Sequence, residues 1–220
     1  MILWDNFYEN DEVLKLLNQH SVEQDYLKIK EVIDFNNIQK IYDQCCGMGR
    51  WSLFLENNKK DVWGCDLSNK SISFVKENSA HPERYFIKNV LDYKPSIEYD
   101  LVINYYSSFG SLPTKKDNMK MLTKAIEVLA SNGYLVLEFI NKDYIINNFK
   151  SKIEYDNIIR KSQIENDKLH QKWIIGKKEY DTTMLMINKD DVIVFLQKKG
   201  LDVIYSEVTD RNLIIFQKKN

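Results

Sequence analysis

The sequence has few of the residues that break, bend or cross-link a chain. Its 220 residues include only 7 glycines, 3 prolines and 3 cysteines. Cys45 and Cys46 are adjacent and only Cys65 remains, which fits neither a disulfide framework nor the CxxC spacing of a zinc site. We therefore expect reduced cysteines and no metal. Since no linker or repeat interrupts the chain, we also expect a single domain over residues 1–220.

The sequence also lacks a charge of one sign and long apolar runs. Lysine plus arginine number 31 against 32 aspartates plus glutamates, a net charge of −1, so no broad cationic field attracts nucleic acid or anionic lipid. The longest apolar runs are four or five residues, too short to cross a bilayer. The first ten residues, MILWDNFYEN, have no basic segment before an apolar stretch, so they do not form a secretory signal. We expect a cytoplasmic protein that binds neither nucleic acid nor membrane.

What is present is an ordinary globular composition with helical and strand patterns in alternation. Apolar residues make up 44% of the chain and charged residues 29%. Ser21 followed by Gln24 predicts a capping box and a helix over about 21–34, after which 39–45 has a strand pattern and helical spacing resumes near Trp51. The same patterns predict strands at 61–66, 84–90, 99–106 and 134–140, and helices at 68–78 and from Thr114 to Asn132.

The last third of the chain has a different pattern. Residues 151–187 contain polar-laced strand segments, which predict an antiparallel ribbon inserted before a helix at 189–199. Two further strand segments, at 201–208 and 212–218, predict a hairpin at the edge of the sheet. Alternating strands and helices indicate a parallel sheet covered on both faces, so the predicted fold class is α/β and Rossmann-like.

A glycine turn follows the first predicted strand. Gly47 and Gly49 allow a ligand to approach the backbone closely, at the crevice where open α/β sheets bind ligands. Asp43 precedes the turn, and Asp66, 17 residues beyond Gly49 at the end of the second strand, is placed to accept hydrogen bonds from ribose hydroxyls. A dinucleotide site would favour glycine or alanine where Ser52 stands, so a nucleoside ligand fits better than a pyrophosphate.

Four segments together resemble a known family. The strings YDQCCGMGRWSLFL, WGCDLS, YDLVINYYSSFGSL and LASNGYLVLEFIN resemble, in order and spacing, the class I S-adenosylmethionine-dependent methyltransferases. The resemblance is to the small-molecule branch, which includes sugar-amine N,N-dimethyltransferases and glycine-type N-methyltransferases. It covers roughly 1–150 and the closing hairpin. It implies a seven-stranded, mostly parallel sheet with one antiparallel strand at the end, and S-adenosylmethionine as cofactor, without a metal.

The resemblance also implies where the cofactor binds. The methionine moiety would lie against the glycine turn and the end of the fourth strand, the ribose against the acid that ends the second strand, and the adenine beside the residues that follow the second and third strands. The residues implied by these positions are Asp43, Cys45, Gly47, Gly49, Asp66, Leu67, Asn89, Val90, Asn104 and Tyr105.

Two of these positions depart from the family pattern. Cys45 replaces the first glycine of the usual D-x-G-x-G turn, and it is small enough to fit. Asn89 stands where many members place an aspartate, and its carbonyl oxygen can make the same hydrogen bond without a charge.

The acceptor side depends on the chemistry. A neutral amine needs only alignment with the methyl group, whereas a hydroxyl needs a general base. The candidate catalytic residues are Tyr8, Tyr106, Glu138 and His170. A lone histidine beside lysines is usually just exposed, and a structural role explains Glu138 as well as a catalytic one does. We expect residues 1–38 to form a helical lid and 151–187 to cover the substrate, which the resemblance implies is a small-molecule amine or hydroxyl.

Other functions remain open at this point. A nucleic-acid methyltransferase of the amino-group type would carry a proline-containing stretch after the fourth strand, and the sequence there is NYYSSFG. A nicotinamide dehydrogenase is disfavoured by Ser52. A protein or peptide methyltransferase, and a non-catalytic protein that binds an adenosyl ligand, are the alternatives. The sequence identifies neither the acceptor, nor the atom methylated, nor the oligomeric state.

Overall fold

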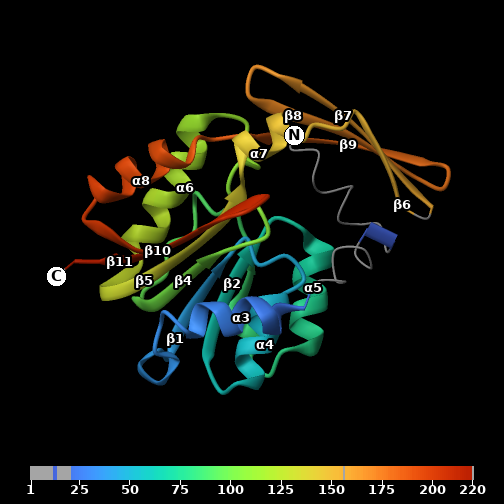
Figure 1. The fold of residues 1–220 in the computed structure, drawn as a ribbon. Coiled ribbons are helices and arrows are strands. Elements are labelled where there is room, and N and C mark those ends of the chain that lie inside the picture. The colour runs from blue at the N-terminus through green and yellow to red at the C-terminus, as the bar shows by residue number, and fades with distance from the viewer. Residues whose placement is uncertain (1–11, 14–20, 156, 220) are drawn as a thin grey trace.

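The fold is known from a computed structural model, which describes residues 12–13, 21–155 and 157–219 (Figure 1). A seven-stranded sheet forms its centre, in the order β10-β11-β5-β4-β1-β2-β3. All neighbours are parallel except for β11, which is antiparallel to both β5 and β10. The α/β, Rossmann-like fold predicted from the sequence is therefore confirmed. Among the described residues, no helix has the length and apolar character needed to cross a membrane.

The strands of this sheet are short and alternate with helices along the chain. The strands are β1 (Lys40–Gln44), β2 (Asp61–Asp66), β3 (Tyr85–Ile87), β4 (Tyr99–Asn104), β5 (Leu129–Ile140), β10 (Leu201–Val208) and β11 (Arg211–Lys218). The helices are α3 (Val22–Lys30), α4 (Arg50–Asn57), α5 (Asn69–Asn78), α6 (Lys115–Glu127), α7 (Lys142–Asn147) and α8 (Lys189–Gln197), with short 3₁₀ turns at Phe35–Asn37 and Pro82–Arg84.

Polar side chains fix where several helices begin. Ser68 caps α5 by accepting from the Ser71 amide, and Thr114 caps α6 by accepting from the Asp117 amide. Ser21 caps α3, but it accepts from the Glu23 amide rather than from Gln24 as the capping-box pattern predicts. The helix starts were therefore predictable from short polar residues.

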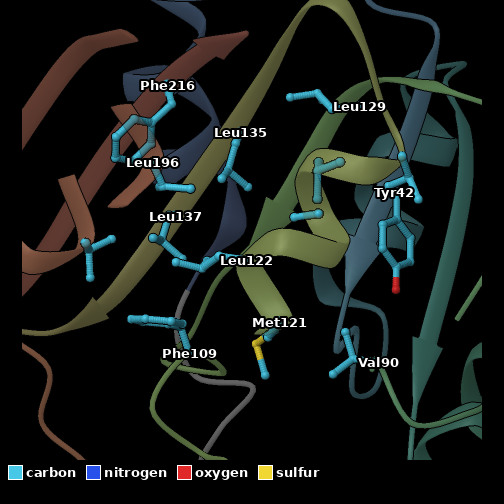
Figure 2. Packing of buried hydrophobic residues seen from close by; sticks show 14 of the residues in the cluster. Tyr42, Val90, Phe109, Met121, Leu122, Leu129, Leu135, Leu137, Leu196 and Phe216 are labelled. Carbon is cyan, nitrogen blue, oxygen red and sulfur yellow. The ribbon is translucent and has the colours of Figure 1, made fainter. Parts of the chain in front are cut away.

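The strands alternate their side chains between two hydrophobic layers. In β4, Leu101 and Ile103 pack with α3 and α4, whereas Val102 packs on the opposite face with α6. Figure 1 shows α3 and α4 on one side of the sheet and α6 on the other. Figure 2 shows the α6 and α8 layer, where Leu122 and Leu196 pack against β5 and β11. Both faces of the central strands are thus buried, which explains their continuous apolar runs.

A second sheet stands where the sequence predicted the inserted ribbon. Its antiparallel strands are β6 (Lys152–Tyr155), β7 (Ile158–Glu165), β8 (Lys168–Ile175) and β9 (Lys178–Leu185). We call these four strands the ribbon. The Leu185 amide at its end donates to the Gly110 carbonyl at 2.8 Å, which joins the ribbon to the loop after β4. Figure 1 shows the ribbon beside α7.

Several predicted boundaries are wrong. The helix predicted at 21–34 ends at Lys30, and the strand predicted at 99–106 ends at Asn104. The strand predicted at 84–90 ends at Ile87. Asn89 instead starts a turn, in which the Asn89 side chain accepts a hydrogen bond from the Leu91 amide. The helix predicted to end at Asn132 stops at Glu127, because Leu129 is buried and pairs with Tyr99 as part of β5. The helix predicted at 189–199 ends at Gln197.

Candidate active site at the carboxyl edge of the sheet

The turn between β1 and α4 places three residues in left-handed backbone conformation. Cys45, Gly47 and Gly49 have φ angles of 61°, 53° and 71°. A Cβ atom at Gly49 would come within 2.8 Å of Val75, so this glycine allows α4 to pack against α5. A Cβ atom at Gly47 would meet nothing within 4 Å. Gly47 therefore borders open space, as a residue beneath a ligand must.

Asp66 joins this turn to the end of β2. Its two carboxylate oxygens accept from the Gly47 amide at 3.0 Å and from the Ser68 amide at 2.9 Å. These bonds hold the carboxylate beside the turn and the start of α5. A carboxylate is an acceptor only, with about four lone-pair sites, so it is a suitable group for ligand hydroxyls.

Asp43 lies beneath the same turn and is almost completely buried. Its carboxylate accepts a 2.6 Å hydrogen bond from the Ser52 hydroxyl, and its side chain is 4% exposed. Burial raises the pKa of Asp43 to about 6, although the Ser52 bond opposes this effect. No local sequence pattern predicts the contact between Asp43 and Ser52. From the sequence, Ser52 only disfavours a dinucleotide-binding site.

The end of β4 is braced from inside the protein. Asn104 is fully buried, donates to the Gln44 side chain at 2.9 Å and accepts from the Phe109 amide at 3.1 Å. The ring of Tyr105 packs edge-on against Trp51, with centroids 5.3 Å apart. Because Asn104 is fully buried, its side chain does not border open space, and its contact with the cofactor stays a prediction.

Leu67, Asn89 and Val90 follow the neighbouring strands β2 and β3. Leu67 is 42% exposed and directly follows Asp66, whereas Val90 is buried in the core. The carboxyl ends of parallel strands meet at one edge of a sheet, which puts Leu67 and the turn at Asn89 on the same edge as the glycine turn. Their roles beside an adenine stay predictions.

The residues after Asn104 are held in an unfavourable backbone conformation. Tyr106 and Ser107 have φ angles of 55° and 61°, which side chains other than glycine rarely adopt. The buried carboxylate of Glu138 accepts from the Ser107 amide and the Ser107 hydroxyl, each at 3.2 Å. Arg211 lies 3.6 Å from the same carboxylate and also donates to the Ser107 hydroxyl. Glu138 and Arg211 thus fix the turn from two neighbouring strands.

Tyr106 itself points its polar end into a buried environment. The Arg50 guanidinium lies 3.4 Å from the centre of the Tyr106 ring, and the hydroxyl is buried without a hydrogen-bond partner among the described residues. Burial raises the pKa of Tyr106 well above its usual range. Burial also raises the pKa of Glu138. Tyr106 is therefore neutral at physiological pH and is a poor general base.

The similarity of this chain to known proteins agrees with the geometry of the site. Residues 41–133, from β1 through the start of β5, match the family model of a methyltransferase domain. The matched stretch contains the glycine turn, Asp66 and the braced end of β4, and the strand order is that of the class I fold. Residues 41–133 therefore form a methyltransferase domain, and the whole chain has the fold seen in S-adenosylmethionine-dependent methyltransferases. A search of curated proteins by sequence finds no match.

Several solved structures share the fold of this chain at low sequence identity. An S-adenosylmethionine-dependent methyltransferase from Clostridium acetobutylicum has 14% identity and a TM-score of 0.78, over 99% of both chains. An S-adenosylmethionine-bound amino pentose methyltransferase from Micromonospora echinaspora, involved in calicheamicin biosynthesis, has 15% identity and a TM-score of 0.73 over 95% and 96% of the chains. A sugar N-methyltransferase from Streptoalloteichus has 13% identity and a TM-score of 0.71 over 92% and 88%.

Two predicted catalytic residues are not found at the carboxyl edge of the sheet. Tyr8 lies outside the described residues. So do residues 1–11 and 14–20 of the lid predicted at 1–38. His170 is on β8, where its Nδ1 atom is 3.0 Å from the Thr183 hydroxyl. Its neighbour Leu169 packs toward the end of β5, so His170 lies on the opposite face of the ribbon.

Within residues 12–13, 21–155 and 157–219, no three His, Cys, Asp or Glu side chains gather as a metal site would require. Cys65 is buried and lies 3.0 Å from the Tyr42 hydroxyl, and burial raises the pKa of the Cys65 thiol to about 12. Such a thiol is protonated and unreactive at neutral pH.

Proposed function

We propose that this protein transfers a methyl group from S-adenosylmethionine to a small-molecule acceptor, an amine in preference to a hydroxyl. The observation that carries this proposal is the open space in front of Gly47, bordered by the Asp66 carboxylate, in a chain whose residues 41–133 match a methyltransferase domain. The protein and peptide alternatives have no comparable support in the described residues.

The donor set of the turn fits an adenosyl cofactor. Asp66 offers carboxylate lone pairs for ribose hydroxyls, and Leu67 and the turn at Asn89 lie beside it for the adenine. Gly47 leaves space for the ligand, and the buried Asp43 provides negative potential beneath the turn. When bound, S-adenosylmethionine supplies a methyl group that is already electrophilic because it is attached to a sulfonium sulfur.

The chain's own residues then have to align the acceptor and exclude water. An amine that arrives neutral needs no general base, whereas a hydroxyl must lose its proton. Tyr106 has a raised pKa and cannot take that proton near neutral pH. The Glu138 carboxylate is occupied by Ser107 and Arg211. These two observations favour an amine acceptor, and they leave orientation as the main contribution of the protein to the rate.

Similar solved structures support a small-molecule acceptor. Similar structures include an amino pentose methyltransferase and a sugar N-methyltransferase, both of which act on small molecules. The net charge of −1 gives no field that would favour a polyanionic substrate.

The proposal is tested by measuring S-adenosylhomocysteine formation with a panel of small amines, matched alcohols, peptides and oligonucleotides. We expect turnover with one or more amines, none with the corresponding alcohols, and none from an Asp66→Ala variant at cofactor concentrations that saturate the wild type. Turnover on peptides or oligonucleotides alone would contradict the proposed acceptor class.

A further inference from the structure

The ribbon has two chemically different faces. Side chains alternate across a strand, so residues paired across β7, β8 and β9 form rows on one face. The strand register puts Arg160, Trp173 and Tyr180 in one row, and Ser162, Gln171 and Thr182 in the next. We call the face that carries these two rows the inner face.

The inner face is turned toward the rest of the protein. At one end of it, Leu169 and Met184 pack with Ile140 at the end of β5. At the other end, Ile158 and Ile175 pack against Val13. Trp173 and Tyr180 of the first row pack against this second cluster. The row of Ser162, Gln171 and Thr182 therefore lies between the contact with β5 and the contact with Val13.

The outer face neutralises its own charges. Lys172 lies 2.8 Å from Glu179 and 3.7 Å from Asp181, and similar pairs of opposite charge occur elsewhere on this face. These pairs are exposed to solvent and contribute little to stability. The outer face has the ordinary character of a protein surface.

The inner face carries positive charge, and the described residues of the four strands place no carboxylate on that face. Among the described residues of β6 to β9, its charged side chains are Arg160 and, at the edge, Lys178. The Arg160 guanidinium lies 5.3 Å from the centre of the Trp173 ring and 5.8 Å from that of Tyr155. Its Nε atom is buried and has no hydrogen-bond partner in the part of the chain that the structure describes. A buried N–H group of a cation that has no acceptor is costly, and an anion bound at this face would supply one.

The neighbouring row supplies uncharged hydrogen-bonding groups. Ser162, Gln171 and Thr182 lie across the three strands, about 5 Å apart in such a row. Thr182 is 2% exposed and accepts a 3.1 Å hydrogen bond from the Trp173 indole. The rows thus combine one planar cation with hydroxyl and amide groups, which is a donor set for a small, polar, anionic molecule.

We propose that Arg160, with the row of Ser162, Gln171 and Thr182, binds an anionic group of the methyl acceptor, a carboxylate or a phosphate. This inference rests on the proposed function, because it assigns the ribbon's inner face to the acceptor of that reaction. It narrows the acceptor to an amine that carries a negative charge away from the methylated nitrogen.

The test uses matched pairs of amines that differ in the anionic group. The probes are ethylamine with β-alanine for a carboxylate, and ethanolamine with O-phosphoethanolamine and glucosamine with glucosamine 6-phosphate for a phosphate. Each probe is titrated by calorimetry into protein saturated with S-adenosylhomocysteine, at constant ionic strength. We expect the anionic member of at least one pair to bind at least tenfold more tightly, and the pair that responds identifies the anion.

Two substitutions connect this preference to Arg160. Arg160→Gln should remove the preference, and Arg160→Lys should keep only part of it because an ammonium lacks the planar fork of a guanidinium. The matched control is Lys161→Gln, which removes the same charge one residue along β7 from the exposed outer face and should leave the preference intact.

Three results would overturn the inference. They are equal affinities within every pair for the wild type, loss of the preference in Lys161→Gln as large as in Arg160→Gln, or a preference that survives Arg160→Gln in a protein of normal thermal stability. Failure to bind S-adenosylhomocysteine would contradict the proposed function, whereas normal binding without an anion preference would contradict only this assignment.

Discussion

A single methyl group added at Gly47 should separate folding from cofactor binding. The Gly47→Ala side chain enters space in which no atom lies within 4 Å, so the folded protein has room for it. The remaining cost is the left-handed backbone, with φ of 53°, which for alanine is about 1–2 kcal/mol. In a chain of this size that cost lowers the melting temperature by about 2–8 °C.

The effect on cofactor binding should be larger. If S-adenosylhomocysteine lies against Gly47, the added carbon occupies ligand space, and we expect affinity to fall at least 100-fold, equivalent to about 2.7 kcal/mol. At a concentration of 100 times its dissociation constant, the ligand stabilises the wild type by about 2.7 kcal/mol, or about 5–11 °C. The same concentration should stabilise Gly47→Ala by only about 0.4 kcal/mol, about 1 °C.

The ribbon provides a matched control for this experiment. Gly176 has φ of 61° and also borders open space, so Gly176→Ala carries the same backbone cost far along the chain from the glycine turn. Thermal unfolding should show similar losses of stability in both variants, and a ligand-induced shift of normal size only in Gly176→Ala. A normal shift in Gly47→Ala would refute the placement of the cofactor at this turn.

Three further predictions concern the acids around the site. Asp66→Ala should weaken S-adenosylhomocysteine at least tenfold by calorimetry, because it removes charge-assisted hydrogen bonds; unchanged affinity would exclude a ribose contact. Because the pKa of Asp43 is about 6 in the folded protein and 3.8 is its ordinary value, the stability that it contributes is present below about pH 4 and is lost as the pH rises through 6. The free energy of unfolding of Asp43→Asn, measured in urea relative to the wild type, should therefore rise by at most about 3 kcal/mol from pH 4 to pH 7. The same relative stability at pH 4 and pH 7 would contradict the argument that burial raises the pKa of Asp43. Glu138→Ala should lose about 2–4 kcal/mol, since it leaves Ser107 and Arg211 without their acceptor, whereas Glu138→Gln should lose less; equal losses would show that the carboxylate does not hold this turn.

The local features of the fold were predictable from the sequence. The strand predicted at 61–66 matches β2 at both ends, and the next helix begins after the predicted cap Ser68. The end of α6 was not predictable, because Leu129 continues into β5 through its pairing with Tyr99, 30 residues earlier in the chain. Long-range strand pairing decided that boundary against the local glycine signal at Gly133.

The candidate site divides in the same way. Gly47, Gly49 and Asp66 were predicted because the turn and the strand end are local patterns, and the structure brings Asp66 and Gly47 into contact. The contact between Ser107 and Arg211 joins residues 104 positions apart, and no short pattern indicates it. The inner face of the ribbon is similar, because its rows exist only once the register of β7, β8 and β9 is known.

The most direct test of the central claim is a calorimetric titration of the wild-type chain with S-adenosylhomocysteine and, separately, with NAD. The account predicts one binding site for S-adenosylhomocysteine, competition by S-adenosylmethionine, and no heat of binding with NAD. Binding of NAD in place of the adenosyl ligands, or no binding of either, would contradict the assignment of the glycine turn to a methyl-transfer cofactor.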